Sequence, residues 1–449
     1  MERPLEYLRR RSDGNFLLGY DNNEAIDPIE DLSTQLSQNY TSRRIIIAET
    51  DPCQFFVYFI AAVSANCSVF LCNPNWGQTE WQQVFKIVEP DLILGNLEEY
   101  FHFKRSKVRG KKSEVFFSLP VSSILIPTGG SSGKIRFTIH TWETLTASVA
   151  GFYEYFDRKV INSFCILPLY HVSGLMQLMR SLVSGGKIAI FSYKDLKNGK
   201  LPEIDPEDFF ISLVPTQLQF LLESNPIWLS RFQTVLLGGA ATARSLLDTA
   251  RKSNINLAPT YGMTETASGV VILKPKDFLD GNNSSGKVLS HAEVNINSDR
   301  IINIKSKSMC FGYYPDLSLD KEYFSTDDLG YFDRDGYLYI IGRNSQKIIT
   351  GGENVFPAEV EAAILATGLV KDICVIGLPD DKWGEVVTAL YVAKEKNISA
   401  EEIKQNLKIS KYKMPKYWFK IEQIPRCDRG KINFSKIKQI AIELSRNSF

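Results

Sequence analysis

The chain has 449 residues, and its 52 lysines and arginines nearly balance 51 aspartates and glutamates, giving a formal net charge of +1. Hydrophobic residues make up 44% and charged residues 23%, a globular composition that excludes global disorder, collagen and a long coiled coil. The length allows about three domain-sized units. The balanced charge argues against a nucleic-acid partner, since such proteins usually carry a basic excess.

The cysteines and histidines indicate the compartment. The seven cysteines and four histidines are scattered, with no CxxC pair and no zinc signature. Residues 1–16 (MERPLEYLRRRSDGNF) are charged and lack the apolar stretch of a secretory signal. We therefore expect reduced thiols and a cytoplasmic location, or its equivalent in a plastid, the stroma.

One segment has the length of a membrane span. Residues 52–79 carry no charge, and residues 55–72 read FFVYFIAAVSANCSVFLC. The polar side chains of Ser64, Asn66 and Ser68, and the NPN break that follows, favour a soluble interpretation. The segment predicts a buried helix (about 53–65) leading into a buried strand (about 68–72), so no membrane anchor is expected.

Short apolar runs alternate with helical stretches through the first two thirds of the chain. Most of these runs lack apolar–polar alternation, which is typical of buried parallel strands joined by helical crossovers. This pattern predicts an α/β fold with a large N-terminal domain of mixed or parallel sheets. The predicted strands are residues 44–48, 69–72, 92–94, 124–126, 163–167, 187–191, 210–214 and 234–237.

The pattern changes after about residue 285. Alternating residues at 294–306 and a hairpin signal at 331–342 predict antiparallel strands. A compact α+β unit follows, with predicted helices at 357–366 and 400–407 and predicted strands at 370–377 and 386–392. We place the boundary just after the hairpin, which divides the chain into an N-terminal domain of residues 1–344 and a C-terminal domain of residues 345–449.

The segment PTGGSSGKIR (127–136) follows the predicted strand at 124–126 and has the make-up of a phosphate-binding loop. Glycines let backbone N–H groups approach phosphate oxygens, hydroxyls add donors, and basic side chains offset the charge. It is not a P-loop, because Thr128 stands where that motif needs glycine and Ile135 follows the lysine. On this segment alone, a polar surface loop explains the pattern as well as a nucleotide site does.

Three more polar segments favour the nucleotide site. They are LPLYHVSG (167–174), LLGGA (236–240) and YGMTETAS (261–268), and the first two begin at the ends of predicted strands. In open α/β sheets, ligands bind at the carboxyl ends of the strands. Four such segments in one chain indicate a ligand site where a single one would not.

Together these motifs resemble the acyl-adenylate-forming (AMP-binding) superfamily of acyl- and aryl-CoA ligases, over nearly the whole chain. Residues 128–136 look like its phosphate loop, and YGMTET (261–266) looks like its adenine and magnesium motif. STDDLG (325–330) corresponds to its ribose-binding segment, and PRCDRGKIN (425–433) to its C-terminal lysine loop. The stretch GRNSQKIITGGENVFPAEVE (342–361) is similar to the 2-succinylbenzoate–CoA ligases of menaquinone and phylloquinone biosynthesis.

The resemblance implies an AMP-forming acid–thiol ligase that uses ATP, Mg²⁺ and coenzyme A. A substrate carboxylate would attack the α-phosphate of ATP to give an acyl-adenylate and pyrophosphate, and the thiol of coenzyme A would then displace AMP. The implied acid is 2-succinylbenzoate, an aryl-keto carboxylic acid. Another aryl- or acyl-CoA ligase and a non-catalytic adenylate-binding homologue are the alternatives, and the oligomeric state is left open.

The resemblance also implies roles for single residues. Thr264 would contact the α-phosphate, Glu265 would bind Mg²⁺, Lys431 would stabilise the charge that develops during adenylation, and Ser345 would lie at the hinge of a mobile C-terminal domain. The implied phosphate-binding residues are Thr128, Gly129, Gly130, Ser131, Ser132, Gly133, Lys134 and Arg136. The implied nucleoside-binding residues are Tyr261, Gly262, Met263, Asp328 and Arg343. The implied acid pocket consists of His171, Gly238, Gly239, Ala240 and Ser268, and His171 would gate it.

Each role has a structural alternative. Glu265 is otherwise a solvated turn carboxylate, His171 a buried structural histidine and Lys431 a surface lysine. The lysines at 408, 411, 413 and 416 would meet coenzyme A phosphates or form a solvated basic face.

Two departures from the family pattern concern the phosphate side of the site. Ile135-Arg136-Phe137 replaces the usual Pro-Lys-Gly, so a planar guanidinium replaces a compact ammonium group. Asp327 replaces the usual glycine before the ribose aspartate. An inward carboxylate there would repel phosphates, so we expect the Asp327 side chain to face outward.

Overall fold

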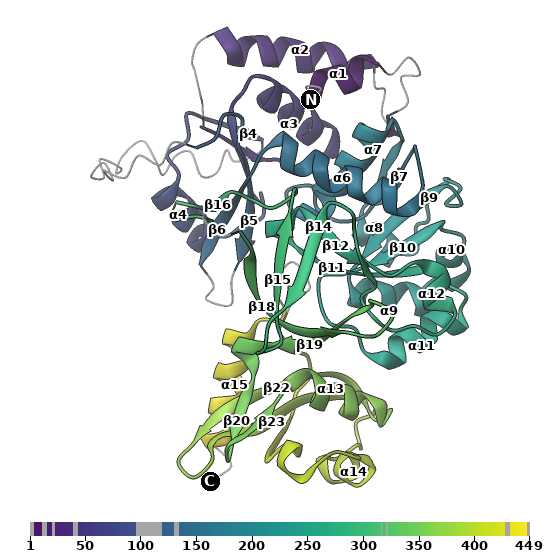
Figure 1. Cartoon of the computed structure of the whole chain (residues 1–449), viewed down its shortest axis with the longest axis vertical. Helices are drawn as coiled ribbons and strands as arrows, with labels where there is room; N and C mark the ends of the chain where they lie inside the picture. The colour runs from purple at the N-terminus through teal and green to yellow at the C-terminus, as the bar shows by residue number, and fades with distance from the viewer. Residues whose placement is uncertain are drawn as a thin grey trace.

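The computed structural model of the chain describes residues 4–10, 16–19, 23–38, 44–95, 119–129, 134–315, 317–319, 322–426 and 432–446. Within those ranges the strands form four sheets. Figure 1 shows the N-terminal two thirds of the chain above and the C-terminal unit below.

The largest sheet contains most of the parallel strands. Every pair from β1 to β11 is parallel, whereas β12 and β13 extend the sheet with antiparallel pairs. In spatial order the strands are β1 (Leu17–Leu18), β8 (Ile188–Ile190), β7 (Asn162–Cys165), β9 (Phe209–Leu213), β10 (Thr234–Leu237), β11 (Leu257–Met263), β12 (Ser268–Ile272) and β13 (Lys287–Val288).

A second sheet combines parallel strands with an antiparallel edge. Strands β4, β2, β3 and β5 are parallel, and β6, β16 and β17 continue the sheet with antiparallel pairs. In spatial order the strands are β17 (Leu317–Ser318), β16 (Gly312–Tyr314), β6 (Ile135–His140), β5 (Ile124–Gly129), β3 (Ser68–Leu71), β2 (Arg44–Ala48) and β4 (Leu92–Gly95). All eight strands predicted from the apolar runs are confirmed in these two sheets.

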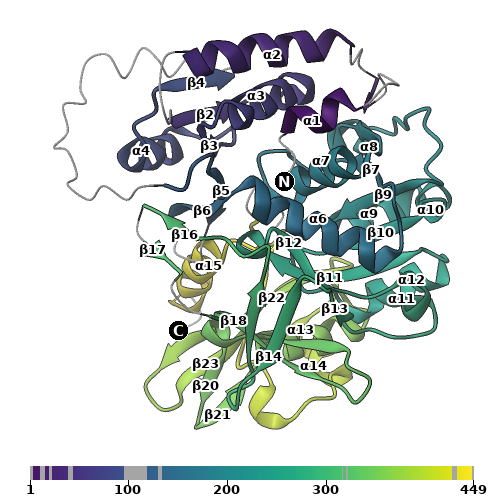
Figure 2. The ribbon, with the colours of Figure 1, turned by 45° about the horizontal axis from the view of Figure 1, so that its top comes forward.

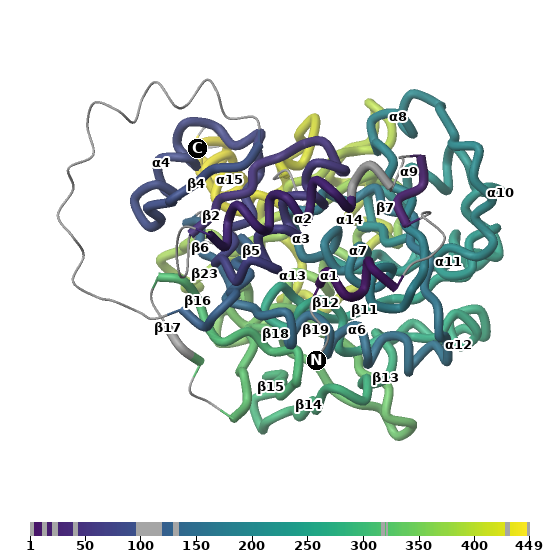
Figure 3. The backbone as a smooth tube through the Cα atoms, turned by 90° about the horizontal axis from the view of Figure 1, so that it is seen from above, coloured from purple at the N-terminus to yellow at the C-terminus, as the bar shows by residue number. Residues whose placement is uncertain are grey.

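A layer of helices lies between the two sheets. One continuous core joins Phe59, Val149 and Leu178, from α3, α6 and α7, to Ile47 of the second sheet and Ile188 of the first. Helix α2 runs along α3 (Figures 2 and 3). The helices of the N-terminal part are α1 (Pro4–Arg9), α2 (Asn23–Gln38), α3 (Pro52–Ser64), α4 (Gln78–Ile87), α6 (Trp142–Phe156), α7 (Val172–Ser184), α8 (Tyr193–Lys197), α9 (Pro215–Ser224), α10 (Pro226–Ser230), α11 (Arg244–Lys252) and α12 (Pro275–Leu279).

The uncharged segment folds as the soluble interpretation predicted. Asp51 is the N-cap of helix α3, and its side chain accepts a hydrogen bond from the Gln54 backbone N–H at 2.8 Å. Pro52 occupies the first turn of the helix. The helix leads into β3, and both elements are buried in the layered core. Within the described ranges, no helix has the length and apolar character needed to span a bilayer.

Two antiparallel hairpins follow the layered part. They form a third sheet in the order β14 (Ala292–Ile296), β15 (Ile301–Ser306), β18 (Phe324–Phe332) and β19 (Leu338–Arg343). The hairpins predicted at 294–306 and 331–342 are both confirmed. Strand β19 ends at Arg343 and a single 3₁₀ turn, η2 (Asn344–Gln346), leads into the C-terminal unit.

The C-terminal unit has its own sheet and its own apolar clusters. Its strands are β21 (Glu353–Val355), β20 (Ile348–Thr350), β23 (Gly384–Ala393), β22 (Val370–Asp380) and β24 (Tyr417–Lys420). Its helices are α13 (Pro357–Ala366), α14 (Ala400–Asn406) and α15 (Phe434–Arg446), with the 3₁₀ turn η3 (Lys411–Lys413). One cluster includes Val360 and Val375, and another includes Leu390 and Ile437. Helix α13 also lies against α11 and β19 of the preceding part.

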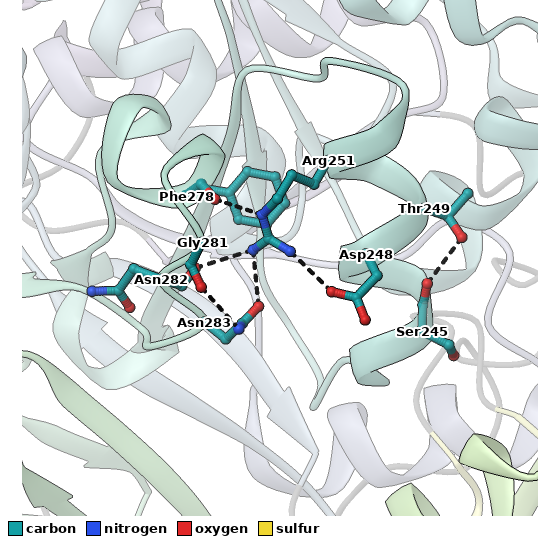
Figure 4. A network of polar contacts seen from close by, with 8 residues as sticks. All are labelled: Ser245, Asp248, Thr249, Arg251, Phe278, Gly281, Asn282 and Asn283. Atoms are coloured by element: carbon teal, nitrogen blue, oxygen red, sulfur yellow. Dashed lines mark hydrogen bonds and ion pairs between the residues drawn. The ribbon is translucent and has the colours of Figure 1, made fainter.

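Arg251 anchors the helix that follows the glycine segment after β10 (Figure 4). Its Nε donates to the Phe278 carbonyl at 2.8 Å, and its terminal nitrogens reach Asp248 and Asn283, each at 2.9 Å. The guanidinium lies 4.4 Å from the centre of the Phe278 ring. These contacts tie the end of α11 to α12 and the loop after it, which holds α11 in place beside β10 and β11.

Replacing Arg251 with Met should lower the stability of the layered part. The methionine keeps the apolar contact with Phe278 but leaves the Phe278 carbonyl and the Asn283 side chain without their donor, at a cost of about 2 kcal/mol. Urea unfolding followed by circular dichroism measures the effect. Arg231→Met is the control, because the ion pairs of Arg231 with Asp205 and Glu207 are exposed and their loss should cost well under about 1 kcal/mol. Equal effects of the two substitutions would contradict the anchoring role.

Candidate functional site

Three of the predicted polar segments lie at one edge of the largest sheet. His171 follows β7, Gly238 follows β10 and Thr264 follows β11, and these strands run parallel in the order β7, β9, β10, β11. The carboxyl ends of parallel strands meet at the same edge, so the fold brings these segments together. The phosphate-loop segment starts at the end of β5 in the second sheet.

His140 joins the two sheets at this edge. Its Nε2 lies 2.8 Å from the Thr264 carbonyl, and its Nδ1 lies 3.0 Å from the Thr144 hydroxyl. A carbonyl can only accept, so Nε2 carries the proton and donates to Thr264, and Nδ1 accepts from Thr144. Burial lowers the pKa of His140 to about 4, so the ring is neutral near pH 7. The end of β6 is thereby attached to the turn that carries Glu265.

Glu265 lies in the 3₁₀ turn η1 (Thr264–Thr266) and is held by the segment at β16. The Tyr313 hydroxyl donates to Glu265 Oε1 at 2.8 Å, and the Cys310 backbone N–H donates to the Glu265 carbonyl at 2.8 Å. The Arg136 guanidinium lies 4.5 Å from the centre of the Tyr313 ring. Burial and the neighbouring carboxylate raise the pKa of Tyr313, so its phenol remains a hydrogen-bond donor.

The surroundings of Glu265 suit Mg²⁺ held mainly by a phosphate ligand. Among the described residues, no group of three or more His, Cys, Asp or Glu side chains is arranged to hold a metal ion. Mg²⁺ commonly takes one or two protein carboxylates and completes its octahedron with substrate phosphates and water. A single carboxylate beside the phosphate-loop strand therefore fits this ion, and it does not fit a structural zinc site.

Asp328 is held from two sides. The Tyr261 hydroxyl donates to Asp328 Oδ2 at 3.0 Å, and Arg343 Nε lies 3.3 Å from Oδ1. Asp328 and Arg343 are paired directly across β18 and β19. Burial and the Asp328 charge raise the pKa of Tyr261, which keeps its proton. A carboxylate oriented in this way can accept hydrogen bonds from the two hydroxyls of a ribose.

The neighbouring Asp327 faces solvent, which confirms the prediction made for it. Its two carboxylate oxygens accept from the backbone N–H of Ser345, at 2.9 Å, and from the Ser345 hydroxyl. The residue that departs from the family pattern thus bonds the predicted hinge residue, a contact that the sequence did not indicate.

The sequence pattern also missed a buried arginine beside the predicted acid pocket. Arg180 in α7 has 5% exposure, donates to the Ser268 hydroxyl at 3.0 Å and lies 4.0 Å from the centre of the Phe152 ring. Burial lowers its pKa to about 10, so it stays charged near neutral pH. Among the described residues no carboxylate pairs with it and its Nε has no hydrogen-bond partner.

An unpaired buried cation is costly unless an anion completes the site. Arg180 and Ser268 therefore place a buried guanidinium beside a hydroxyl, two groups that suit a carboxylate ligand. The available signal was a single arginine inside the otherwise uncharged stretch VSGLMQLMRSLVS (172–184).

The remaining residues predicted for the acid pocket are positioned by different local features. His171 precedes α7 as its N-cap and is buried, with its ring 4.7 Å from that of Tyr170. A Cβ on Gly238 would lie 2.6 Å from the Thr260 hydroxyl, so any larger residue there would force the Thr260 side chain to move. Gly239 has φ +87°, and Ala240 is exposed at the end of the segment. The two glycines let the chain turn tightly across the end of β10.

The phosphate side is only partly described. Thr128 pairs with Arg136 and Gly129 with Ile135 across β5 and β6, and Lys134 is exposed. Gly262 and Met263 lie at the end of β11. Gly130, Ser131, Ser132, Gly133 and Lys431 lie outside the described residues.

The lysines near Pro415 are partly neutralised. Lys413 pairs with Glu359, and Lys416 pairs with Asp380 at 2.8 Å. Lys408 and Lys413 line an open pocket of about 700 Å³ together with Glu359, Ile409 and Ser410. The cluster is therefore less basic than its sequence indicates.

Both the N-terminal part and the C-terminal unit of this chain are similar to known proteins. Residues 121–302 match the AMP-binding enzyme family, and residues 359–431 match the AMP-binding enzyme C-terminal domain. A curated protein of Listeria monocytogenes named 2-succinylbenzoate–CoA ligase is 34% identical over 339 residues, which is 72% of this chain and 71% of that relative.

Two solved structures from Bacillus subtilis resemble the fold over almost its whole length. One is o-succinylbenzoate CoA synthetase in complex with the acyl-adenylate intermediate OSB-AMP, with TM-score 0.85, 25% identity and 98% coverage of each chain. The other is the same enzyme in complex with ATP and a magnesium ion, with TM-score 0.83, 25% identity and coverage of 97% of this chain and 98% of that one. The family resemblance of the motifs is confirmed, and the chain belongs to the AMP-binding enzyme family.

Proposed function

We propose that the protein is an ATP-dependent, AMP-forming ligase that converts 2-succinylbenzoate to 2-succinylbenzoyl-CoA in menaquinone or phylloquinone biosynthesis. The observation that carries the choice of acid is the buried Arg180 with Ser268. The acid has one carboxylate to activate and a second that needs recognition. The buried Arg180 guanidinium, which has no ion-pair partner among the described residues, supplies a counter-charge for it. The relatives named for this reaction support the same choice.

Adenylation requires charge compensation around the triphosphate. Thr128, Lys134 and Arg136, with the loop of residues 129–133, would hold the phosphates, and Thr264 would contact the α-phosphate. Glu265 would bind Mg²⁺, which neutralises charge on the phosphate oxygens when bound. Lys431 would stabilise the negative charge that develops as the acid carboxylate attacks the α-phosphate and pyrophosphate leaves.

The nucleoside would be held on the other side of the site. Asp328 would accept both ribose hydroxyls, and its orientation by Tyr261 and Arg343 supports this role. Residues 261–263 would pass beside the adenine. Because the carboxylate is already fixed by two partners, little conformational entropy is lost when the ribose binds.

The activated end of the acid would lie toward His171 and the glycine segment of residues 238–240, and the second carboxylate toward Arg180. Small residues at 238–240 leave room for a flat aryl ring. The thiol of coenzyme A would then attack the acyl carbon, forming the thioester bond as the bond to AMP breaks.

We also infer a division into an N-terminal domain of residues 1–344 and a mobile C-terminal domain of residues 345–449, with Ser345 as the hinge. The separate sheet and apolar clusters of the C-terminal unit support this division. A cytoplasmic location fits the cysteines, which form no disulfide within the described part of the chain.

Coupled AMP release with a panel of acids tests the function. With ATP, Mg²⁺ and coenzyme A, we expect turnover with 2-succinylbenzoate and at least about 100-fold lower kcat/KM with benzoate or a medium-chain fatty acid, because those acids leave the Arg180 charge unpaired. Preferred turnover of another acid would favour a different CoA ligase. AMP release with none of the acids would favour a non-catalytic homologue.

Arg180→Met should change the choice of acid. Losing the charge partner of the second carboxylate should raise the KM for 2-succinylbenzoate by about 100-fold, while kcat/KM for benzoate changes little. Arg180→Lys keeps the positive charge and should raise the KM for 2-succinylbenzoate by a smaller factor. Arg231→Met, at an exposed ion pair, serves as the control. Equal losses with both acids would exclude recognition of the second carboxylate by Arg180.

A further inference from the structure

We propose that Tyr313 is a positioning residue for adenylation. Its hydroxyl fixes the Glu265 carboxylate for Mg²⁺, and its ring supports the Arg136 guanidinium beside the phosphate loop. The inference rests on the proposed function, because Glu265 is the proposed metal ligand.

The contacts at Glu265 come from one short segment. Tyr313 lies in β16, opposite Thr138 of β6. Its hydroxyl donates to Glu265 Oε1 at 2.8 Å, while the Cys310 backbone N–H donates to the Glu265 carbonyl at 2.8 Å. Residues 310–313 therefore hold both the main chain and the side chain of Glu265.

This arrangement leaves one carboxylate oxygen for a cation. Tyr313 occupies Oε1, and within the described part of the chain Oε2 accepts no hydrogen bond. Mg²⁺ demands nearly ideal octahedral geometry, so the direction of each ligand oxygen affects its binding. Groups that orient a metal ligand typically change metal affinity or activity by about 10- to 100-fold when they are removed.

The ring of Tyr313 has a second contact. Arg136 of β6 pairs with Thr128 of β5, so these two residues flank the phosphate loop. The Arg136 guanidinium is 4.5 Å from the Tyr313 ring centre. A planar guanidinium can stack on an aromatic face and also makes a cation–π interaction with the ring. A compact ammonium group cannot stack in the same way. The arginine that replaces the usual lysine therefore has a support suited to its shape. Tyr313 links this cation to the metal ligand.

Two substitutions of Tyr313 distinguish the role of its hydroxyl from the role of its ring. Tyr313→Phe removes only the hydroxyl, and we expect the Mg²⁺ concentration for half-maximal AMP release to rise by about tenfold. The rate of thioester formation from supplied acyl-adenylate should stay unchanged, because that step does not use the triphosphate. Tyr313→Leu also removes the ring, and we expect a further rise in the KM for ATP.

A matched control tests the same chemical change elsewhere. Tyr323 donates to Glu293 Oε2 at 2.9 Å at an exposed position, so Tyr323→Phe removes a comparable tyrosine–glutamate bond away from the site. This variant should keep the wild-type Mg²⁺ response.

Two outcomes would overturn the inference. One is a Tyr313→Phe enzyme with the wild-type Mg²⁺ response, and the other is an equal loss of both half-reactions with a lowered Tm, which indicates damage to the fold. Failure of the proposed function has different signs: a wild-type protein that releases no AMP with any acid, or a Glu265→Gln variant that keeps the wild-type Mg²⁺ response.

Discussion

Parallel strands that are buried on both faces constrain the whole molecule. Such strands leave only their ends for polar chemistry, because an unpaired polar group inside the sheet would be costly. In this chain β7, β10 and β11 end at one edge, and the segments that follow them carry His171, Gly238 and Thr264. The layer formed by α3, α6 and α7 joins this sheet to the second one, whose β5 leads into the phosphate loop. Packing of the layers thus brings together the segments of the proposed nucleotide site.

Charge is placed locally in this protein, which has a net charge of only +1. Arg343 pairs with Asp328, Arg136 stacks on Tyr313, and Arg180 is buried against Phe152 and Ser268. Each guanidinium is held by a contact that also sets its orientation. A protein with the proposed function, which would bind polyphosphates and a dicarboxylic acid, therefore needs no basic surface. It needs a few cations whose positions are restricted before the ligand arrives.

The strands and hairpins could be predicted because their signals are local. Runs such as residues 44–48 are too apolar to lie anywhere but inside, and Asp335-Gly336 favours a tight hairpin turn. The motif around Glu265 could be recognised because its six residues (261–266) match the family pattern over a short, continuous stretch. Arg180 was missed because a single arginine in an apolar helix carries no motif, and its importance follows only from its burial and lack of an ion-pair partner among the described residues.

The sequence by itself determined the elements, their order, the family and the outward orientation expected for Asp327. Only the tertiary structure decided which distant side chains meet. His140 and Thr264 are 124 residues apart, Arg180 and Ser268 are 88 apart, and Tyr313 and Glu265 are 48 apart. The contact between Asp327 and Ser345 is likewise set by how η2 folds back beside β18. Such pairings depend on strand register and on the packing of one layer against another. The order of residues along the chain specifies neither of these.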